Sequence, residues 1–336
     1  MSQLLLSLRR SALTQLSLGQ WIIVLLMSVI TLPVVLPYFW MLFVSLTSGV
    51  TGSVDTHSLS AIMTAFIPLM LVFFTIQFLI DHQPLRIMLS ISVIVTFMVL
   101  AYARTGEAIS LYSYRFLFEE NTLPSVYASL WNSFLLAGGQ TLLVCIAATG
   151  AGYYLSRFNF RGRSGYMKAL VILHAFPALT LIIPIFLLLY WSNLLDSLTG
   201  VILVIAALEL PFAIFLMKGF FDSVPWDIEM SAMTDGASRI QAFFSVVLPQ
   251  VKNGIIAIGV FSFLKGWEEY VFVTSFIFDS QHWVMSQFLY FFAEDSMGAD
   301  YGLLTAVAVI YLLPSLILYI TCQKYLSQIS VGGTKG

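Results

Sequence analysis

Residues Thr199 to Met217 read TGVILVIAALELPFAIFLM, a stretch of 19 residues in which Glu209 carries the only charge. A helix needs roughly 17 to 25 mostly apolar residues to cross the hydrocarbon core of a bilayer. The backbone polar groups of such a stretch have no water to bond with, and a helix pairs them within the segment itself. The stretch therefore predicts a membrane-spanning helix, and its length sets the scale for the rest of the chain.

Apolar blocks of similar length recur along the 336 residues. Hydrophobic residues make up 59% of the chain and charged residues 10%, whereas a soluble domain has roughly 25% charged residues. The net charge of −2 is too balanced to favour nucleic acid as a partner. We predict an all-α integral membrane protein with about eight transmembrane helices, which makes the lipid bilayer one of its partners. The other predicted spans are Trp21–Ser45, Leu59–Ile80, Ile87–Ala103, Leu130–Leu155, Ala169–Trp191, Ile255–Phe278 and Leu303–Cys322.

The Lys and Arg residues lie almost entirely on one side of the predicted membrane. With the N-terminus inside, only Arg104 and Arg115 of the 15 basic residues fall outside, while Lys265 lies within a span. Cytoplasmic loops carry such an excess of positive charge. We expect a multi-pass protein of the bacterial inner membrane with both termini cytoplasmic. The second and third spans can be removed as a pair without reversing any other span, so residues 59–103 behave as an inserted hairpin.

One predicted cytoplasmic segment is patterned as a helix-turn-helix. Residues 223–249 read SVPWDIEMSAMTDGASRIQAFFSVVLP. Pro225 followed by acidic residues is typical of a helix start, and Gly236 of a helix end. Ser238 and Gln241 have the spacing of a capping box that opens a second short helix, and Pro249 is expected to close it. The element could rest on the membrane surface or dock onto a soluble partner.

This segment resembles the docking loop of binding-protein-dependent ABC importer permeases, whose motif is E-A-A-x3-G-x9-I-x-L-P. Met230 stands where the family usually has the glutamate, and Glu229 precedes it. Either Glu229 substitutes for that glutamate, or the contact with the ATPase has been rebuilt. With Glu229 and Met230, the residues that the resemblance assigns to coupling are Asp235, Gly236, Ala237, Ser238, Leu248 and Pro249.

The resemblance extends from about Tyr114 to the C-terminus and is closest to the second, maltose-type permease of carbohydrate importers. It includes Asn132-Ser133, the block at 156–162, Leu210–Ile214 and Gly266-Trp267-Glu268-Glu269-Tyr270, which is similar to the family's G-x-W-N-E-F. The family has six spans, so the resemblance implies a type I permease core plus the extra hairpin. The expected organisation is a tail and first span at 1–58, the hairpin at 59–103, a periplasmic segment at 104–127, the permease domain at 128–325 with a coupling loop at 222–250, and a cytoplasmic tail at 326–336.

The resemblance implies a transport subunit and not an enzyme. The chain has no G-x4-G-K-[ST] motif for nucleotide phosphates, and we expect it to bind no cofactor or metal of its own. ATP and magnesium would be bound by two ATP-binding cassette subunits, with a second homologous permease and an external sugar-binding protein as further partners. We expect a di- or oligosaccharide as the substrate. A permease for glycerol phosphate or another polyol, and an ion-coupled secondary transporter, are the alternatives.

Ionisable side chains inside predicted spans are candidates for the translocation pathway, because charges are costly there. We expect Trp267, Glu268, Glu269 and Tyr270 to line the pathway or a gate, since carboxylates accept hydroxyl hydrogen bonds and aromatic faces cover sugar rings. Alternatively, one of the two glutamates pairs with Lys265. Glu209 is a further pathway candidate, although it could also bond to backbone freed by Pro211 or face the partner permease.

Overall fold

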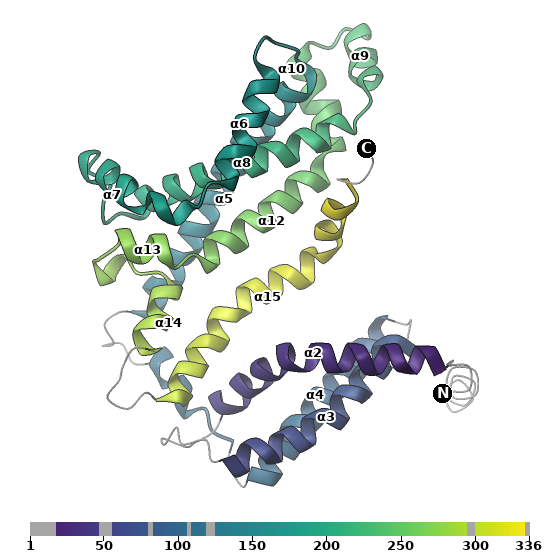
Figure 1. The fold of residues 1–336 in the computed structure, drawn as a ribbon, viewed down its shortest axis with the longest axis vertical. Helices are drawn as coiled ribbons and strands as arrows, with labels where there is room; N and C mark the ends of the chain where they lie inside the picture. The colour runs from purple at the N-terminus through teal and green to yellow at the C-terminus, as the bar shows by residue number, and fades with distance from the viewer. Residues whose placement is uncertain are drawn as a thin grey trace. The chain divides into compact units, whose positions relative to one another are not determined.

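The structure is a computed structural model of the chain, and it describes residues 18–46, 56–79, 83–105, 109–118, 125–293 and 300–332. The secondary-structure elements of these residues are all helices (Figure 1), which confirms the predicted all-α class. The chain divides into two compact units, one of residues 1–119 and 292–310 and the other of residues 120–291 and 311–336.

The first unit contains three long helices joined by an aromatic core. The helices are α2 (Leu18–Ser45), α3 (Thr56–Leu79) and α4 (Gln83–Thr105), followed by the short helix η1 (Tyr112–Leu117). Each long helix contributes one ring to a triad of Phe39, Phe66 and Phe97, whose centroids lie 5.2 to 5.3 Å apart in edge-to-face geometry. The predicted hairpin at 59–103 thus corresponds to α3 and α4, which pack on α2. The expected turn residues Asp81 and His82 lie outside the described residues.

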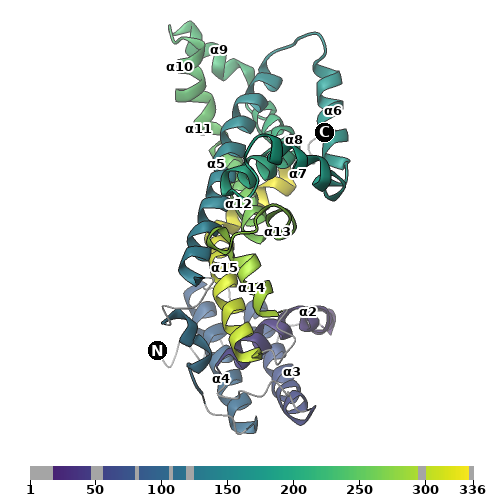
Figure 2. The same ribbon diagram turned by 90° about the vertical axis from the view of Figure 1, so that its left-hand side faces the viewer.

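The second unit is built on three helices that run side by side (Figures 1 and 2): α5 (Val126–Arg157), α8 (Leu198–Asp222) and α12 (Lys252–Glu268). Small residues at their crossings permit close backbone approach, as in membrane helix bundles generally. A Cβ added to Gly152 of α5 would lie 2.7 Å from the Cβ of Met217 and 2.9 Å from the backbone nitrogen of Lys218. The helix α15 (Tyr301–Gly332) ends in this unit and continues past residue 325, where the sequence predicted a tail.

Three helices of the described residues are long and apolar enough to cross a membrane, or up to five segments if each of two bent helix pairs counts as one span. The helices of the first unit contain shorter apolar stretches of 10 to 17 residues. The structure therefore agrees with several membrane spans, and the number eight remains a prediction. The three long helices are Val126–Arg157, Leu198–Asp222 and Tyr301–Gln323.

The fifth predicted span is not one straight helix. It divides into α6 (Arg163–Ala175), a short turn η2 (Ala178–Leu181) and α7 (Ile182–Trp191), and the two parts are bent by 89°. Proline disfavours helical geometry in the residue before it, and Phe176 accordingly adopts an extended backbone with ψ 131°. The break at Phe176-Pro177 is therefore a local effect of the proline. The apolar pattern continues through it and does not predict it.

The seventh predicted span, Ile255–Phe278, is also divided. The helix α12 ends at Glu268, and α13 (Val271–Phe276) begins after Glu269 and Tyr270. Glu269 has an extended backbone, and its carboxylate accepts the backbone N–H of Phe272 at 2.9 Å, which caps α13. Beyond α13 follow η4 (Ser280–His282) and α14 (Met285–Ala293).

Candidate functional site

The patterned segment at 223–249 forms the short helices that the sequence predicts. Helix α9 (Trp226–Thr234) begins after Pro225, and Gly236 adopts a left-handed φ of +94° beyond its end. Helix α10 (Arg239–Ala242) opens with the predicted capping box, in which the side chains and backbone amides of Ser238 and Gln241 bond reciprocally. Figure 2 shows α9 and α10 together at one end of the second unit.

Pro249 does not close the second helix as expected. The chain continues from α10 through a π-helical turn, η3 (Phe243–Val247), into α11 (Leu248–Gln250), with Pro249 in the first turn of α11. The direction changes instead at Val251, where the helix from Arg239 to Gln250 meets α12 at 71°.

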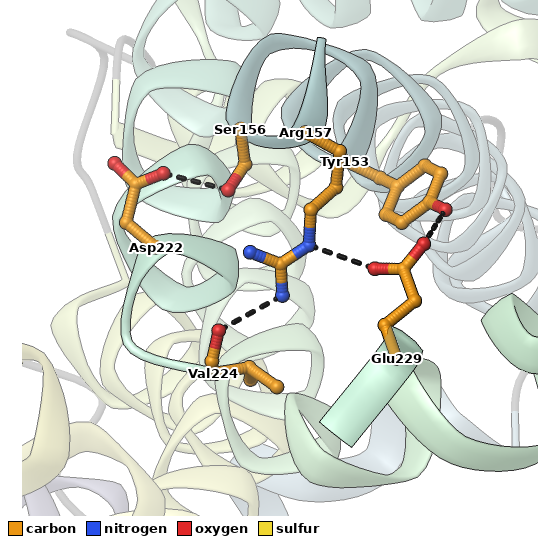
Figure 3. A network of polar contacts seen from close by, with 6 residues as sticks. All are labelled: Tyr153, Ser156, Arg157, Asp222, Val224 and Glu229. Carbon is orange, nitrogen blue, oxygen red and sulfur yellow. Dashed lines mark hydrogen bonds and ion pairs between the residues drawn. The ribbon is translucent and has the colours of Figure 1, made fainter. Parts of the chain in front are cut away.

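Glu229 points into the unit and is fully buried (Figure 3). One of its carboxylate oxygens lies 2.9 Å from Nε of Arg157, and the other accepts the hydroxyl of Tyr153 at 2.6 Å. The Arg157 side chain is 5% exposed, and its Nη2 donates to the carbonyl oxygen of Val224 at 3.0 Å. The carboxylate and the guanidinium are therefore paired with each other and hydrogen-bonded further. We call Tyr153, Arg157 and Glu229 the joint, because it ties α9 to α5.

Two aromatic rings, from Trp226 and Phe243, pack against residues of the joint. The Trp226 ring lies 5.5 Å from the guanidinium carbon of Arg157, and the ring of Phe243 in η3 lies 4.5 Å from that of Tyr153. Removing one partner from a buried ion pair costs about 3 to 5 kcal/mol, because it leaves the other charge uncompensated. The joint therefore favours one position of α9 on the end of α5.

Several apolar side chains of the same segment are exposed. Met230 is 40% exposed, so the residue at the family's glutamate position faces outward while Glu229 faces inward. The others are Ile228 of α9, Ile240 of α10 and Phe244 of η3. Asp235, Ser238 and Pro249 are exposed as well, whereas Ala237 and Leu248 are partly buried. An exposed apolar surface rimmed by polar residues is typical of a protein or membrane contact.

A second buried polar cluster connects the three central helices of the unit. Gln140 of α5 donates through Nε2 to the Glu209 carboxylate of α8, and the same carboxylate oxygen accepts the Ser262 hydroxyl of α12 at 3.0 Å. Gln140 and Ser262 are completely buried and Glu209 is 5% exposed. The structure thus places Glu209 among the helices of its own unit and bonds it to side chains, not to backbone freed by Pro211. Its role in a pathway stays a prediction.

The four other pathway candidates lie at the break between α12 and α13, and they differ in exposure. Trp267 is buried and donates through Nε1 to the carbonyl of Tyr311 in α15 at 3.0 Å. Glu268 is exposed, while Glu269 is partly buried and caps α13. The ring of Tyr270 lies 4.8 Å from that of Tyr290. No ion pair joins Lys265 to either glutamate within the described stretch 125–293.

The break between α12 and α13 was not predicted from the sequence. Helix α12 has 17 residues, so its end lies about 25 Å along the helix axis from Lys252. Non-helical backbone at membrane depth persists only where it is buried in protein or lines a water-filled cavity. Glu268 is thus an exposed carboxylate beside non-helical backbone.

Three comparisons with known proteins bear on this arrangement. A family model described as "Binding-protein-dependent transport system inner membrane component" matches residues 144–328. The diacetylchitobiose uptake system permease protein NgcG of Streptomyces coelicolor is 31% identical over 219 residues, which cover 62% of this chain and 72% of that protein. The sulfoquinovosyl glycerol transport system permease protein SmoH of Agrobacterium fabrum is 31% identical over 208 residues, which cover 62% of this chain and 73% of that protein.

The fold is similar to that in a solved bacterial ABC transporter involved in the import of the acidic polysaccharide alginate. The TM-score is 0.57 at 23% identity, and the match covers 65% of this chain and 80% of the other.

Proposed function

Because the chain belongs to the family of binding-protein-dependent transport system inner membrane components, we propose that it is one permease subunit of an ATP-driven importer for a di- or oligosaccharide. The substrate class is supported by the relatives, among them a diacetylchitobiose permease and a sulfoquinovosyl glycerol permease. ATP and magnesium would be bound by two separate ATP-binding cassette subunits. A second homologous permease and an external binding protein would complete the assembly.

The observation that carries this proposal is the two-sided geometry of α9. Buried Glu229 fixes α9 to α5, whereas Ile228 and Met230 of the same helix are exposed, together with Ile240 of α10 and Phe244 of η3. A surface of this kind fits a groove on a soluble partner. We place this end of the unit in the cytoplasm, as the distribution of Lys and Arg favours. ATP-driven closure of the ATPase subunits would then move the spans as rigid bodies between two arrangements.

Substrate would pass along the exposed end of α12. Glu268 is exposed there, and Tyr270 with Tyr290 provides aromatic surface nearby. Hydroxyl groups of a sugar can donate to the carboxylate, and aromatic rings can cover its C–H faces. Glu268 and Tyr270 are therefore the strongest pathway candidates, whereas Trp267 and Glu269 support the break from inside.

The test is to purify the chain together with the partner permease, ATPase and binding protein, and to reconstitute the complex in liposomes. ATP hydrolysis is then measured with diacetylchitobiose, maltodextrins, galactooligosaccharides, sulfoquinovosyl glycerol and glycerol 3-phosphate. We expect one of the saccharides or glycosides to stimulate hydrolysis and to accumulate inside only with ATP. Stimulation by glycerol 3-phosphate alone would favour the polyol permease, and uptake driven by an ion gradient without ATPase subunits would establish a secondary carrier.

A further inference from the structure

We propose that the joint of Tyr153, Arg157 and Glu229 is a positioning element that makes α9 and α5 move as one body, so that Glu229 acts inside this subunit and not at the ATPase surface. This inference rests on the proposed function, because it concerns how ATP-driven movement enters the spans. It answers the question that the sequence leaves open at positions 229 and 230.

Glu229 and Met230 are neighbours on α9 but point in different directions. Glu229 has no exposed surface, and both of its carboxylate oxygens already have partners on α5. To reach an external cation it would have to leave Arg157 buried without its counter-ion, which is strongly unfavourable. Met230, the neighbour that does face outward, carries no charge. The contact of α9 with a partner is therefore apolar at this position.

Several independent contacts connect the region around α9 to α5. Arg157 pairs with Glu229 within α9. Its Nη2 also donates to the carbonyl oxygen of Val224, just before α9, at 3.0 Å. Tyr153 adds its hydroxyl bond to Glu229 and a ring contact to Phe243 beyond α10. These contacts involve residues before, within and after α9, so a rotation of α9 about any one of them strains the others.

Helix α5 extends from the joint to the buried polar cluster of the three central helices. This helix has 32 residues, which corresponds to a rod of about 48 Å. Part-way along it Gln140 binds Glu209 of α8 and Ser262 of α12. If the joint makes α5 move with α9, the same movement therefore acts on α8 and α12. Helix α12 ends at the break beside Glu268.

The test measures distances between spin labels in the full complex. The labels replace Ser231 on α9 and Tyr154 on α5, both exposed, after Cys145→Ala and Cys322→Ala remove the native thiols. We expect the same narrow distance distribution without nucleotide and after trapping with ATP and vanadate. A shift of the mean distance on trapping would overturn the proposal, because α9 would then turn on α5.

Four variants separate positioning from simple surface charge. Glu229→Gln and Arg157→Gln are each expected to broaden the distribution and to lower ATP-driven uptake per ATP hydrolysed about tenfold, and the double variant is expected to be no worse than either. Asp227→Asn, an exposed acid of the same helix, should change the ratio by less than about twofold. Additive losses in the double variant, or an equal loss in Asp227→Asn, would refute the joint. A wild-type distribution in Glu229→Gln would refute it as well.

Failure of the joint and failure of the proposed function are distinguishable. If the unaltered chain binds no ATPase subunits, the importer function is refuted, while the label distances in the chain alone still test whether Glu229 holds α9. If Glu229→Gln or Arg157→Gln does not fold, Tyr153→Phe replaces them, since it removes one hydrogen bond and leaves the ion pair. Partial broadening in Tyr153→Phe supports the joint, and an unchanged distribution contradicts it.

Discussion

The closeness of α5 to α8 at Gly152 can be tested by adding one methyl group. In Gly152→Ala the new Cβ would lie 2.7 Å from the Cβ of Met217, 2.9 Å from the backbone nitrogen of Lys218 and 3.0 Å from the carbonyl carbon of Met217. Ordinary contacts between such atoms are about 3.5 to 4.0 Å, so the two helices must separate by about 1 Å. The neighbouring atoms belong to the backbone or its first side-chain carbon, and no rotamer change relieves them.

The chain offers a matched control two residues away. In Gly150→Ala the added Cβ has nothing within 4 Å, so this variant only gains the helix propensity of alanine, about 0.5 to 1 kcal/mol. Gly152→Ala gains the same amount and loses about 1 to 3 kcal/mol to overpacking. The difference between the two variants is thus the overpacking itself. At about 2 to 4 °C per kcal/mol for a chain of this order of size, Gly152→Ala should melt about 2 to 12 °C below Gly150→Ala.

The measurement is a thermal unfolding scan of both variants in the same detergent at the same heating rate, because unfolding of such proteins is often irreversible and depends on scan rate. Since Tyr153 follows Gly152 directly, the displaced helix should also weaken coupling in the reconstituted complex. Equal melting temperatures for the two alanine variants would show that α5 and α8 do not approach this closely.

Three further predictions concern the coupling segment and the buried cluster. Gly236→Ala should lower the stability of the protein by about 1 to 2 kcal/mol through its left-handed backbone alone, since a Cβ there meets nothing within 4 Å. We expect intact insertion with less uptake per ATP. Unchanged coupling would contradict the docking role. Ser238→Ala should lose about 1 kcal/mol of capping, seen as faster amide exchange in α10, whereas equal exchange would argue against the cap. Glu209→Leu should destabilise the chain by about 1 to 3 kcal/mol, because the buried Ser262 hydroxyl loses its acceptor and Gln140 Nε2 keeps only its bonds to Ser262. Glu209→Gln should destabilise it less. A changed KM for the transported saccharide with unchanged melting would support the predicted pathway role of Glu209, whereas lower melting with an unchanged KM would limit its role to helix packing.

Local patterns allowed much of the fold to be predicted from the sequence. Apolar blocks marked the helices, and the spacing of Pro225, Gly236, Ser238 and Gln241 marked α9 and α10, because helix starts, ends and caps depend on neighbours within a few residues. The breaks at Phe176 and Glu269 were missed. Apolar periodicity continues through both, and the causes are a proline's effect on its predecessor and a carboxylate that caps the next helix.

The buried partners of the site could not be predicted, because they come from distant parts of the chain. Arg157 is 72 residues from Glu229, and Gln140 is 69 residues from Glu209. In the sequence Arg157 stood out as one more positive charge in a cytoplasmic loop and as part of the family-like block at 156–162, and neither observation indicated its partner. The signal that could have singled it out is its position at the very end of a predicted span, where a guanidinium is within reach of the next intracellular segment.

That same separation has a consequence for how the protein is made. Between Arg157 and Glu229 lie α6, α7 and α8, so the guanidinium is synthesised long before its carboxylate. At about 5 to 20 residues per second, the 72 residues take roughly 4 to 14 s to translate. Because a charged side chain is costly in lipid, we expect the unpaired guanidinium to keep the end of α5 in water throughout that interval. Arg157 would then act as a temporary stop for its own helix during biosynthesis, before it becomes part of the finished joint.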